Sequence, residues 1–174
     1  MKLPLLPKVV VVDTNFLIAN ADPKTSEDTR HRITHIFAIA EKTKTRIIFP
    51  MPAIAEYLVQ ADEGALNILN VLEKKTFIFA APFDRAAAFE CALLERQARE
   101  SGDKRDGSTI PWQKIKIDRQ IIGIARAQGA TLIITNDQNL KLNAMRFGIL
   151  SIDIDEFDLP EDAKQQTLPS IPAK

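Results

Sequence analysis

The sequence predicts an α/β fold in which successive βα units surround a parallel sheet. Short apolar runs alternate with longer segments of helical period, and this alternation is typical of such units. The chain has 174 residues, 45% of them hydrophobic, which is enough for one domain with a full core and too few for two of ordinary size. We therefore expect a single domain over residues 1–157 and a polar, disordered C-terminal tail over residues 158–174.

The predicted strands are short runs rich in β-branched or aromatic residues, each followed by a polar or proline-containing break. Five such runs occur, at Val9–Val12, Arg46–Phe49, Thr76–Phe79, Thr131–Ile134 and Ile149–Ile152.

The predicted helices fill the gaps between these strands with apolar residues at helical spacing. They lie at residues 28–42, from Pro52 through Val59, at residues 65–72, from about Asp84 to Arg99, and from Asp118 to Gln128. Gly129 stops the last of them. The stretch at residues 101–108 is rich in glycine and charge, so we expect an exposed, mobile loop there.

Composition and charge exclude several classes of protein. Lys plus Arg number 23 and Asp plus Glu number 23, so any nucleic-acid binding has to come from a local patch. The single cysteine, Cys91, excludes an intramolecular disulfide and fits a reducing compartment. No apolar run approaches the roughly 18 residues that a membrane span needs. We expect a cytoplasmic protein that is neither secreted nor embedded in a membrane.

Acidic side chains follow three of the predicted strands. Asp13 follows the first strand, Glu56 the second and Asp137 the fourth. Because the carboxyl ends of parallel strands meet at one edge of the sheet, these carboxylates should lie together there. Asp118 opens the helix that leads into the fourth strand, and a right-handed crossover places it at the same edge.

Such a cluster of carboxylates predicts a divalent-metal site. Carboxylates this close repel and raise one another's pKa values unless a cation neutralises them. Oxygen ligands suit Mg²⁺ or Mn²⁺, which keep several waters and accept phosphate oxygens. The chemistry expected is hydrolysis of phosphodiester bonds by a metal-activated water, which agrees with the lack of a persuasive Ser–His or Cys–His pair.

Each acid by itself also has an ordinary structural explanation. Asp13, Asp118 and Asp137 stand near predicted helix starts, where a carboxylate caps free backbone N–H groups. Glu56 lies in an apolar helical stretch, where a lone acid is unfavourable unless it is paired, binds a cation or faces solvent. The occurrence of all these acids in order at the strand ends favours the metal site.

The motifs that carry these acids resemble the PIN domain from residue 9 to about residue 157. They are Val-Val-Asp13-Thr14-Asn15, Pro52-Ala53-Ile54-Ala55-Glu56, Ile117-Asp118-Arg119-Gln120-Ile121-Ile122-Gly123-Ile124-Ala125 and Ile134-Thr135-Asn136-Asp137. The family is best known for the VapC toxins of toxin–antitoxin pairs, which are Mg²⁺-dependent ribonucleases. The resemblance implies a three-layer sandwich with a five-stranded parallel sheet, and it maps the family's four acids onto Asp13, Glu56, Asp118 and Asp137.

The resemblance also implies supporting residues and partners. Thr14 or Asn15 would hold an acid or a metal-bound water, and Thr135 and Asn136 precede the last acid. Asn136 stands where some relatives have a further aspartate, and the loop from Ser101 to Gln113 is longer than in compact toxins. A small antitoxin protein would cover the acidic cleft. The helices after Glu56 would form a homodimer face, although an ordinary core helix gives the same pattern.

A local basic stretch runs beside the predicted site. We expect RNA contacts from a set of lysines and arginines in the loop and the helix after it, namely Lys104, Arg105, Lys114, Lys116 and Arg119. Trp112 would either stack a base or, as we favour, pack on the domain. His31 and His35 have the spacing of a zinc pair, but Arg32 stands where a metalloprotease has glutamate, so we predict surface or interface histidines.

The sequence thus predicts a Mg²⁺- or Mn²⁺-dependent endoribonuclease, the toxin of a toxin–antitoxin pair, with Asp13, Glu56, Asp118 and Asp137 as metal ligands. One rival is an aspartyl-phosphate enzyme with Asp13 as nucleophile, but that chemistry wants a second aspartate where Asn15 stands. The other rival is a non-catalytic PIN-like module that binds RNA or protein, against which the complete set of acids argues.

Overall fold

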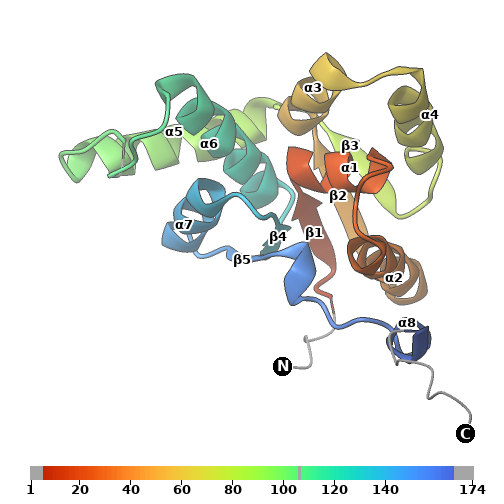
Figure 1. Ribbon diagram of the computed structural model, residues 1–174. Helices are drawn as coiled ribbons and strands as arrows, with labels where there is room; N and C mark the ends of the chain where they lie inside the picture. Colours follow the sequence, from red (N-terminus) through yellow and green to blue (C-terminus); the bar gives the residue numbers. More distant parts are fainter. Residues whose placement is uncertain (1–5, 106, 167–174) are drawn as a thin grey trace, which may run out of the picture.

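The protein is a three-layer α/β sandwich built on one parallel sheet (Figure 1). The structure, a computed structural model, describes residues 6–105 and 107–166. Its five strands follow the order β3-β2-β1-β4-β5, and all neighbouring pairs are parallel. They are β1 (Val9–Val12), β2 (Arg46–Pro50), β3 (Ile78–Ala81), β4 (Leu132–Ile134) and β5 (Leu150–Ile152). The predicted fold class is confirmed.

Helices connect the strands and cover both faces of the sheet. They are α1 (Thr14–Ala21), α2 (Glu27–Thr43), α3 (Met51–Gln60), α4 (Glu63–Leu72), α5 (Arg85–Glu100), α6 (Trp112–Ala127), α7 (Gln138–Arg146), the short 3-10 helix η1 (Ile154–Glu156) and α8 (Glu161–Gln166). No helix in these residues is long and apolar enough to cross a membrane.

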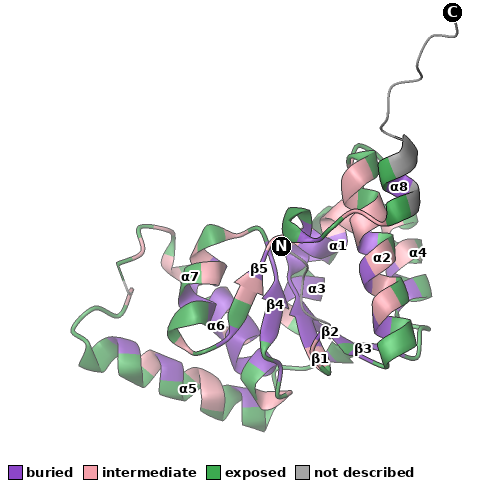
Figure 2. Cartoon of the chain, turned by 90° about the horizontal axis from the view of Figure 1, so that it is seen from below, coloured by how far each residue is buried: buried purple, intermediate pink, exposed green. Residues whose placement is uncertain are grey.

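Two hydrophobic cores flank the central strand β1. Val10 and Val12 point into a core shared with α1, α2 and α4, whereas Val11 points into a core shared with α5, α6 and α7. All three side chains are fully buried, which explains why β1 is an uninterrupted apolar run. Figure 2 shows the buried central strands between helices whose outer sides are exposed.

Helix α6 begins at Trp112 and not, as predicted, at Asp118. The carbonyl of Pro111 accepts the first bonds of the helix, from the backbone N–H groups of Lys114 and Ile115. The polar residues of this turn resemble a loop in the sequence, but Ile115 is fully buried beneath them. Asp118 therefore lies more than one turn inside the helix and does not cap it. Strand β3 likewise lies two residues later than predicted, at Ile78–Ala81 instead of Thr76–Phe79.

The predicted disordered tail is helical in part. Residues 161–166 form α8, and Ala163 of this helix is buried. The rest of the predicted tail, residues 167–174, lies outside the described residues, as does Asp106 in the loop before α6.

Asp103 stabilises the loop before α6, because its carboxylate accepts hydrogen bonds from the backbone N–H groups of Arg105 and Gly107.

Helices α5 and α6 pack closely because Gly123 has no side chain at their crossing. A Cβ atom at Gly123 would stand 2.8 Å from the carbonyl oxygen of Ala87 and 3.1 Å from the Cβ atom of Cys91. Both atoms belong to α5 and are fixed by its backbone, so they could give way only if the whole helix moved. The contact fixes α6, and with it Asp118, against the rest of the domain.

We expect the Gly123→Ala variant to be less stable than the wild type by about 1–3 kcal/mol, because the added methyl group forces α5 and α6 apart. Chemical denaturation with urea measures the difference. Gly64→Ala is the matched control, since a Cβ there meets only the flexible Asp62 side chain at 3.3 Å. Equal stability of the two variants would show that the α5–α6 contact is not tight.

Candidate active site

Asp13 lies at the junction between β1 and α1 and is almost completely buried, with 4% of its surface exposed. One carboxylate oxygen, Oδ1, accepts a hydrogen bond of 3.1 Å from the backbone N–H of Phe16 and so caps α1. The other oxygen, Oδ2, accepts a hydrogen bond of 2.5 Å from the Thr135 hydroxyl. Burial raises the pKa of Asp13 to about 6, against the opposing effect of these hydrogen bonds.

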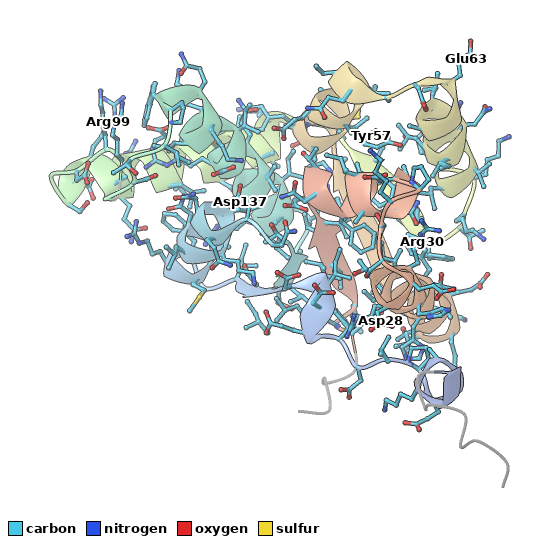
Figure 3. All side chains as sticks on the ribbon, viewed as in Figure 1. Asp28, Arg30, Tyr57, Glu63, Arg99 and Asp137 are labelled. Carbon is cyan, nitrogen blue, oxygen red and sulfur yellow. The ribbon has the colours of Figure 1, made fainter. Side chains whose placement is uncertain are left out.

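Asp137 caps α7 at the end of the neighbouring strand β4, and Figure 3 labels its position beside α6 and α7. Its Oδ1 atom accepts hydrogen bonds from the backbone N–H groups of Asn139 and Leu140. Its own backbone N–H donates to the Thr135 hydroxyl oxygen over 2.9 Å. Since that hydroxyl donates to Asp13, Thr135 links the two acids directly.

Lys114 supplies positive charge at this edge of the sheet. Its ammonium group stands 2.7 Å from Oδ2 of Asp137. Burial raises the pKa of the Asp137 carboxyl, but the bond from Lys114 and the backbone donors outweigh burial and leave that pKa below its usual range. Burial also disfavours the charged form of Lys114, but Asp137, together with the charges of Asp118 and Glu56, raises its pKa. Lys114 is therefore a cation among acids.

Asp118 is the least compensated of the predicted ligands. It is 3% exposed, and its Oδ2 atom has no hydrogen-bond partner within residues 6–105 and 107–166. Burial raises its pKa to about 7, and the negative charges of Asp137, Glu56 and Asp13 add to the effect of burial while Lys114 opposes it. A buried carboxylate oxygen without a partner is unfavourable and calls for a cation or a proton.

Glu56 is exposed on α3 and so takes the solvent-facing alternative considered for it. It still belongs to the cluster, because its Oε2 atom accepts a hydrogen bond of 2.7 Å from the Thr14 hydroxyl. Among the other predicted supporting residues, the Asn15 amide lies 3.5 Å from Oδ2 of Asp13, a weak contact, and Asn136 is exposed. Thr14 and Thr135 thus make the strong supporting contacts.

The four predicted acids share one edge of the sheet and influence one another electrostatically. Within the described residues, however, no three Asp, Glu, His or Cys side chains lie close enough to hold a metal ion as they stand. The ammonium group of Lys114 instead neutralises Asp137. Sequence reasoning missed this role, although a lysine four residues before Asp118 on one helix face would have indicated it.

These residues fit a divalent cation in their chemistry. Asp13, Asp118, Asp137 and Glu56 offer hard oxygen donors, and Asp118 presents a buried oxygen that is not otherwise bound. Burial, together with the neighbouring acids, raises the pKa values of Asp13 and Asp118, and a bound cation would favour their charged forms. The side chain of Lys114 is 42% exposed, so it has room to move away from Asp137 when another cation arrives.

Both arginines predicted to bind RNA make structural contacts within the protein. Arg119 is fully buried: its guanidinium group pairs with Glu95 at 3.0 Å and donates to the backbone carbonyl of Lys104 at 2.7 Å. It therefore fastens α6 to α5 and to the loop, and its burial leaves the guanidinium group no exposed surface for the RNA contact expected from the sequence. Arg105 donates to the carbonyl of Ile110 within the loop at 3.1 Å.

The basic residues of α6 fall on two sides of the helix. At about 100° per residue, Lys114 and Asp118 share one face, whereas Trp112 and Lys116 point in nearly the opposite direction. The predicted single basic patch beside the acids is therefore divided. Lys114 joins the acids, and Lys104 and Lys116 lie with Trp112 on the side of α5.

The histidine pair of α2 does not form a metal site within the described residues. His31 and His35 are half-buried and line a cavity of about 490 Å³ between α2 and the C-terminal segment, together with Asp158 and Glu161.

A family model and several solved structures match this arrangement. The model of the PIN domain matches residues 10–145, which is most of the chain and includes all four acids. The chain belongs to the PIN domain family. Its sequence matches no curated protein.

Solved structures similar to this PIN domain include chains of bacterial VapBC complexes and a VapC toxin. A chain of the DNA-bound VapBC2 complex from Rickettsia felis has a TM-score of 0.57 at 13% identity, covering 83% of this chain and 98% of its own. A chain of the DNA-bound VapBC complex from Salmonella typhimurium has a TM-score of 0.56 at 20% identity, covering 85% and 99%. VapC20 of Mycobacterium tuberculosis, a toxin that cleaves the sarcin–ricin loop, has a TM-score of 0.53 at 14% identity, covering 82% and 98%. At such identities, the likeness shows a shared fold.

We expect Asp118→Asn to raise the melting temperature of the metal-free protein at pH 8 by roughly 2–8 °C. The substitution removes an uncompensated buried charge that lowers the free energy of unfolding by about 1–2 kcal/mol. The pKa of Asp118, about 7 in the folded protein against an ordinary 3.8, means that the folded state binds this proton more tightly than the unfolded chain. The stability of the wild type without metal should therefore fall as the pH rises from about 4 to about 7, and the variant should lose less.

Thermal unfolding of the wild type and Asp118→Asn in EDTA, from about pH 4 to about pH 8, measures this difference. Asp22→Asn, at an exposed position, is the control. At pH 4 the wild type and Asp118→Asn should melt alike, because a protonated aspartate resembles asparagine. A lower melting temperature for Asp118→Asn at pH 8 would show that the carboxylate is compensated without metal.

Proposed function

We propose that the protein is a Mg²⁺- or Mn²⁺-dependent endoribonuclease that acts in the cytoplasm and hydrolyses RNA phosphodiester bonds at the acidic edge of the sheet. The observation that carries the proposal is the buried Asp118 oxygen without a described partner, facing the negative charges of Asp13, Asp137 and Glu56. Such an arrangement is unfavourable for stability alone and is typical of a functional site. Membership of the PIN domain family supports a nuclease.

Asp13, Asp118, Asp137 and Glu56 would hold the cation. When bound, Mg²⁺ or Mn²⁺ would supply a water of lowered pKa as the nucleophile and neutralise charge on the phosphate. Thr135 keeps Asp13 and Asp137 at a fixed separation through its two hydrogen bonds, and Thr14 holds Glu56. Backbone N–H groups at the N-termini of α1 and α7 donate hydrogen bonds to the carboxylates of Asp13 and Asp137 and so orient them. These carboxylates therefore need little reorganisation during the reaction.

Lys114 would contact the substrate phosphate in this reaction. Its ammonium group already lies among the acids and its side chain is partly exposed. A cation shared by the acids would weaken its attraction to Asp137 and leave the ammonium group available for a phosphate oxygen of the RNA. Lys114 would thus make the RNA contact predicted for it from the sequence, and it would do so at the phosphate that reacts.

The solved structures suggest a biological role as the toxin of a toxin–antitoxin pair. Several of them are chains from VapBC complexes, and nearly the whole of each such chain aligns with this protein. The partner proposed for this chain is a small antitoxin that covers the acidic cleft. Apolar side chains exposed on α3 and α4, such as Leu58, Val59 and Leu66, are available for that partner or for a homodimer, whereas Leu69 and Leu72 belong to the core.

A non-catalytic module that binds RNA or protein is the second candidate. The observation in its favour is the ion pair between Lys114 and Asp137, which neutralises part of the site without metal, together with the absence of a ready three-ligand group among the described residues. The two candidates differ in whether a divalent cation enables chemistry at this edge.

Wild-type protein should cleave labelled single-stranded or structured RNA in the presence of Mg²⁺ or Mn²⁺ and lose the activity in EDTA. Asp13→Asn should lower the cleavage rate at least about 100-fold, since it removes a proposed ligand on which Thr135 also depends. Asp22→Asn should cleave like the wild type. Gel analysis of the products measures the rates.

Cleavage by Asp13→Asn at the wild-type rate would place the activity elsewhere or reveal a contaminating nuclease. RNA binding by the wild type without metal-stimulated cleavage of any RNA in a broad panel would favour the non-catalytic module.

A further inference from the structure

A basic cavity lies between α5 and α6, away from the acidic edge. Its volume is about 550 Å³, within the usual range for ligand sites, and its lining includes Arg96, Arg99, Lys104, Trp112, Lys116 and Glu95. Figure 3 labels Arg99 near the far end of α5, on the projecting arm that α5, the loop and the start of α6 form.

Four cations in this cavity have no acidic partner among the described residues. Arg96, Arg99, Lys104 and Lys116 are all exposed, and none of them forms an ion pair within residues 6–105 and 107–166. The one carboxylate in the lining, Glu95, already pairs with the buried Arg119. Cations gathered around one cavity repel each other, so the site favours a ligand that carries negative charge.

The Trp112 ring holds part of this charge in place. The ammonium groups of Lys104 and Lys116 lie 5.3 and 5.8 Å from the ring centroid, and the guanidinium carbon of Arg119 lies 5.5 Å from it. These distances are those of cation–π interactions. Trp112 is half-buried, so it both packs on the domain, as favoured from the sequence, and keeps part of its ring at the cavity.

We propose that this cavity binds single-stranded RNA at a distance from the bond that is cut. Phosphates would contact the arginines and lysines, and a base would lie against Trp112. The proposal rests on the proposed function and adds to it a second contact region. Because Trp112 and Lys114 both lie in the first turn of α6 but on opposite sides, a strand held in the cavity would reach the acidic edge by crossing the start of this helix.

RNA fits the cavity better than an acidic protein segment does. A nucleotide brings both a phosphate and a flat aromatic base, whereas an acidic peptide brings carboxylates and uses only the cations. The cavity combines arginines, whose planar groups bind phosphate in a forked manner, with the only tryptophan of the chain.

Trp112 provides the test, because its fluorescence reports on this cavity alone. In EDTA, which prevents cleavage, a short single-stranded RNA should change the Trp112 emission in a saturable manner. The double variant Arg99→Gln/Lys116→Gln should bind at least about 10-fold more weakly, and the dependence of log affinity on log salt should flatten by roughly 0.7 for each charge removed. Lys74→Gln, an exposed lysine after α4, should behave as the wild type.

Two further outcomes separate this proposal from the proposed function. Asp13→Asn should retain the fluorescence response although its cleavage is lost. RNA binding that the double variant leaves unchanged, or an equal response to polyglutamate and RNA, would overturn the cavity as an RNA site, whatever the cleavage assay shows.

Discussion

The candidate site is defined by buried negative charge at the carboxyl edge of β1 and β4 that the protein only partly compensates. Asp13 and Asp137 are positioned by the starts of α1 and α7 and joined through one hydroxyl, that of Thr135. Asp118 adds a buried oxygen with no described partner, and Lys114 neutralises one acid of the group. Val10, Val11 and Val12 of β1 are fully buried, so the close-packed core keeps the strand, and the Asp13 that follows it, in place.

Helix α6 connects this charge to the rest of the molecule. One side of the helix gives Lys114 and Asp118 to the acidic edge, and the other gives Trp112 and Lys116 to the basic cavity. Arg119 holds the helix to α5 by its ion pair with Glu95 and to the loop by its hydrogen bond to the carbonyl of Lys104. The acids of the proposed cation site and the cations of the proposed RNA cavity thus lie on opposite sides of one helix.

The sequence was sufficient for the fold and for the edge at which the acids lie, because buried strands such as Val9–Val12 and the acids that follow them are local signals. It failed where tertiary packing decides the outcome. The polar first turn of α6 resembled a loop, so the sequence did not reveal the ion pair between Lys114 and Asp137. Arg119 resembled a surface cation, although it is fully buried in an ion pair, and no local pattern distinguishes the two.

The most direct test of this account is the binding of Mn²⁺ at pH 8, followed by the electron paramagnetic resonance signal of the free ion. The account predicts that the wild type removes Mn²⁺ from solution, that Asp118→Asn binds it at least about 10-fold more weakly, and that Lys114→Gln binds it more tightly because the competing ammonium group is gone from Asp137. Wild-type protein that leaves the free signal unchanged, with Lys114→Gln behaving in the same way, would contradict the claim that these acids form a cation site.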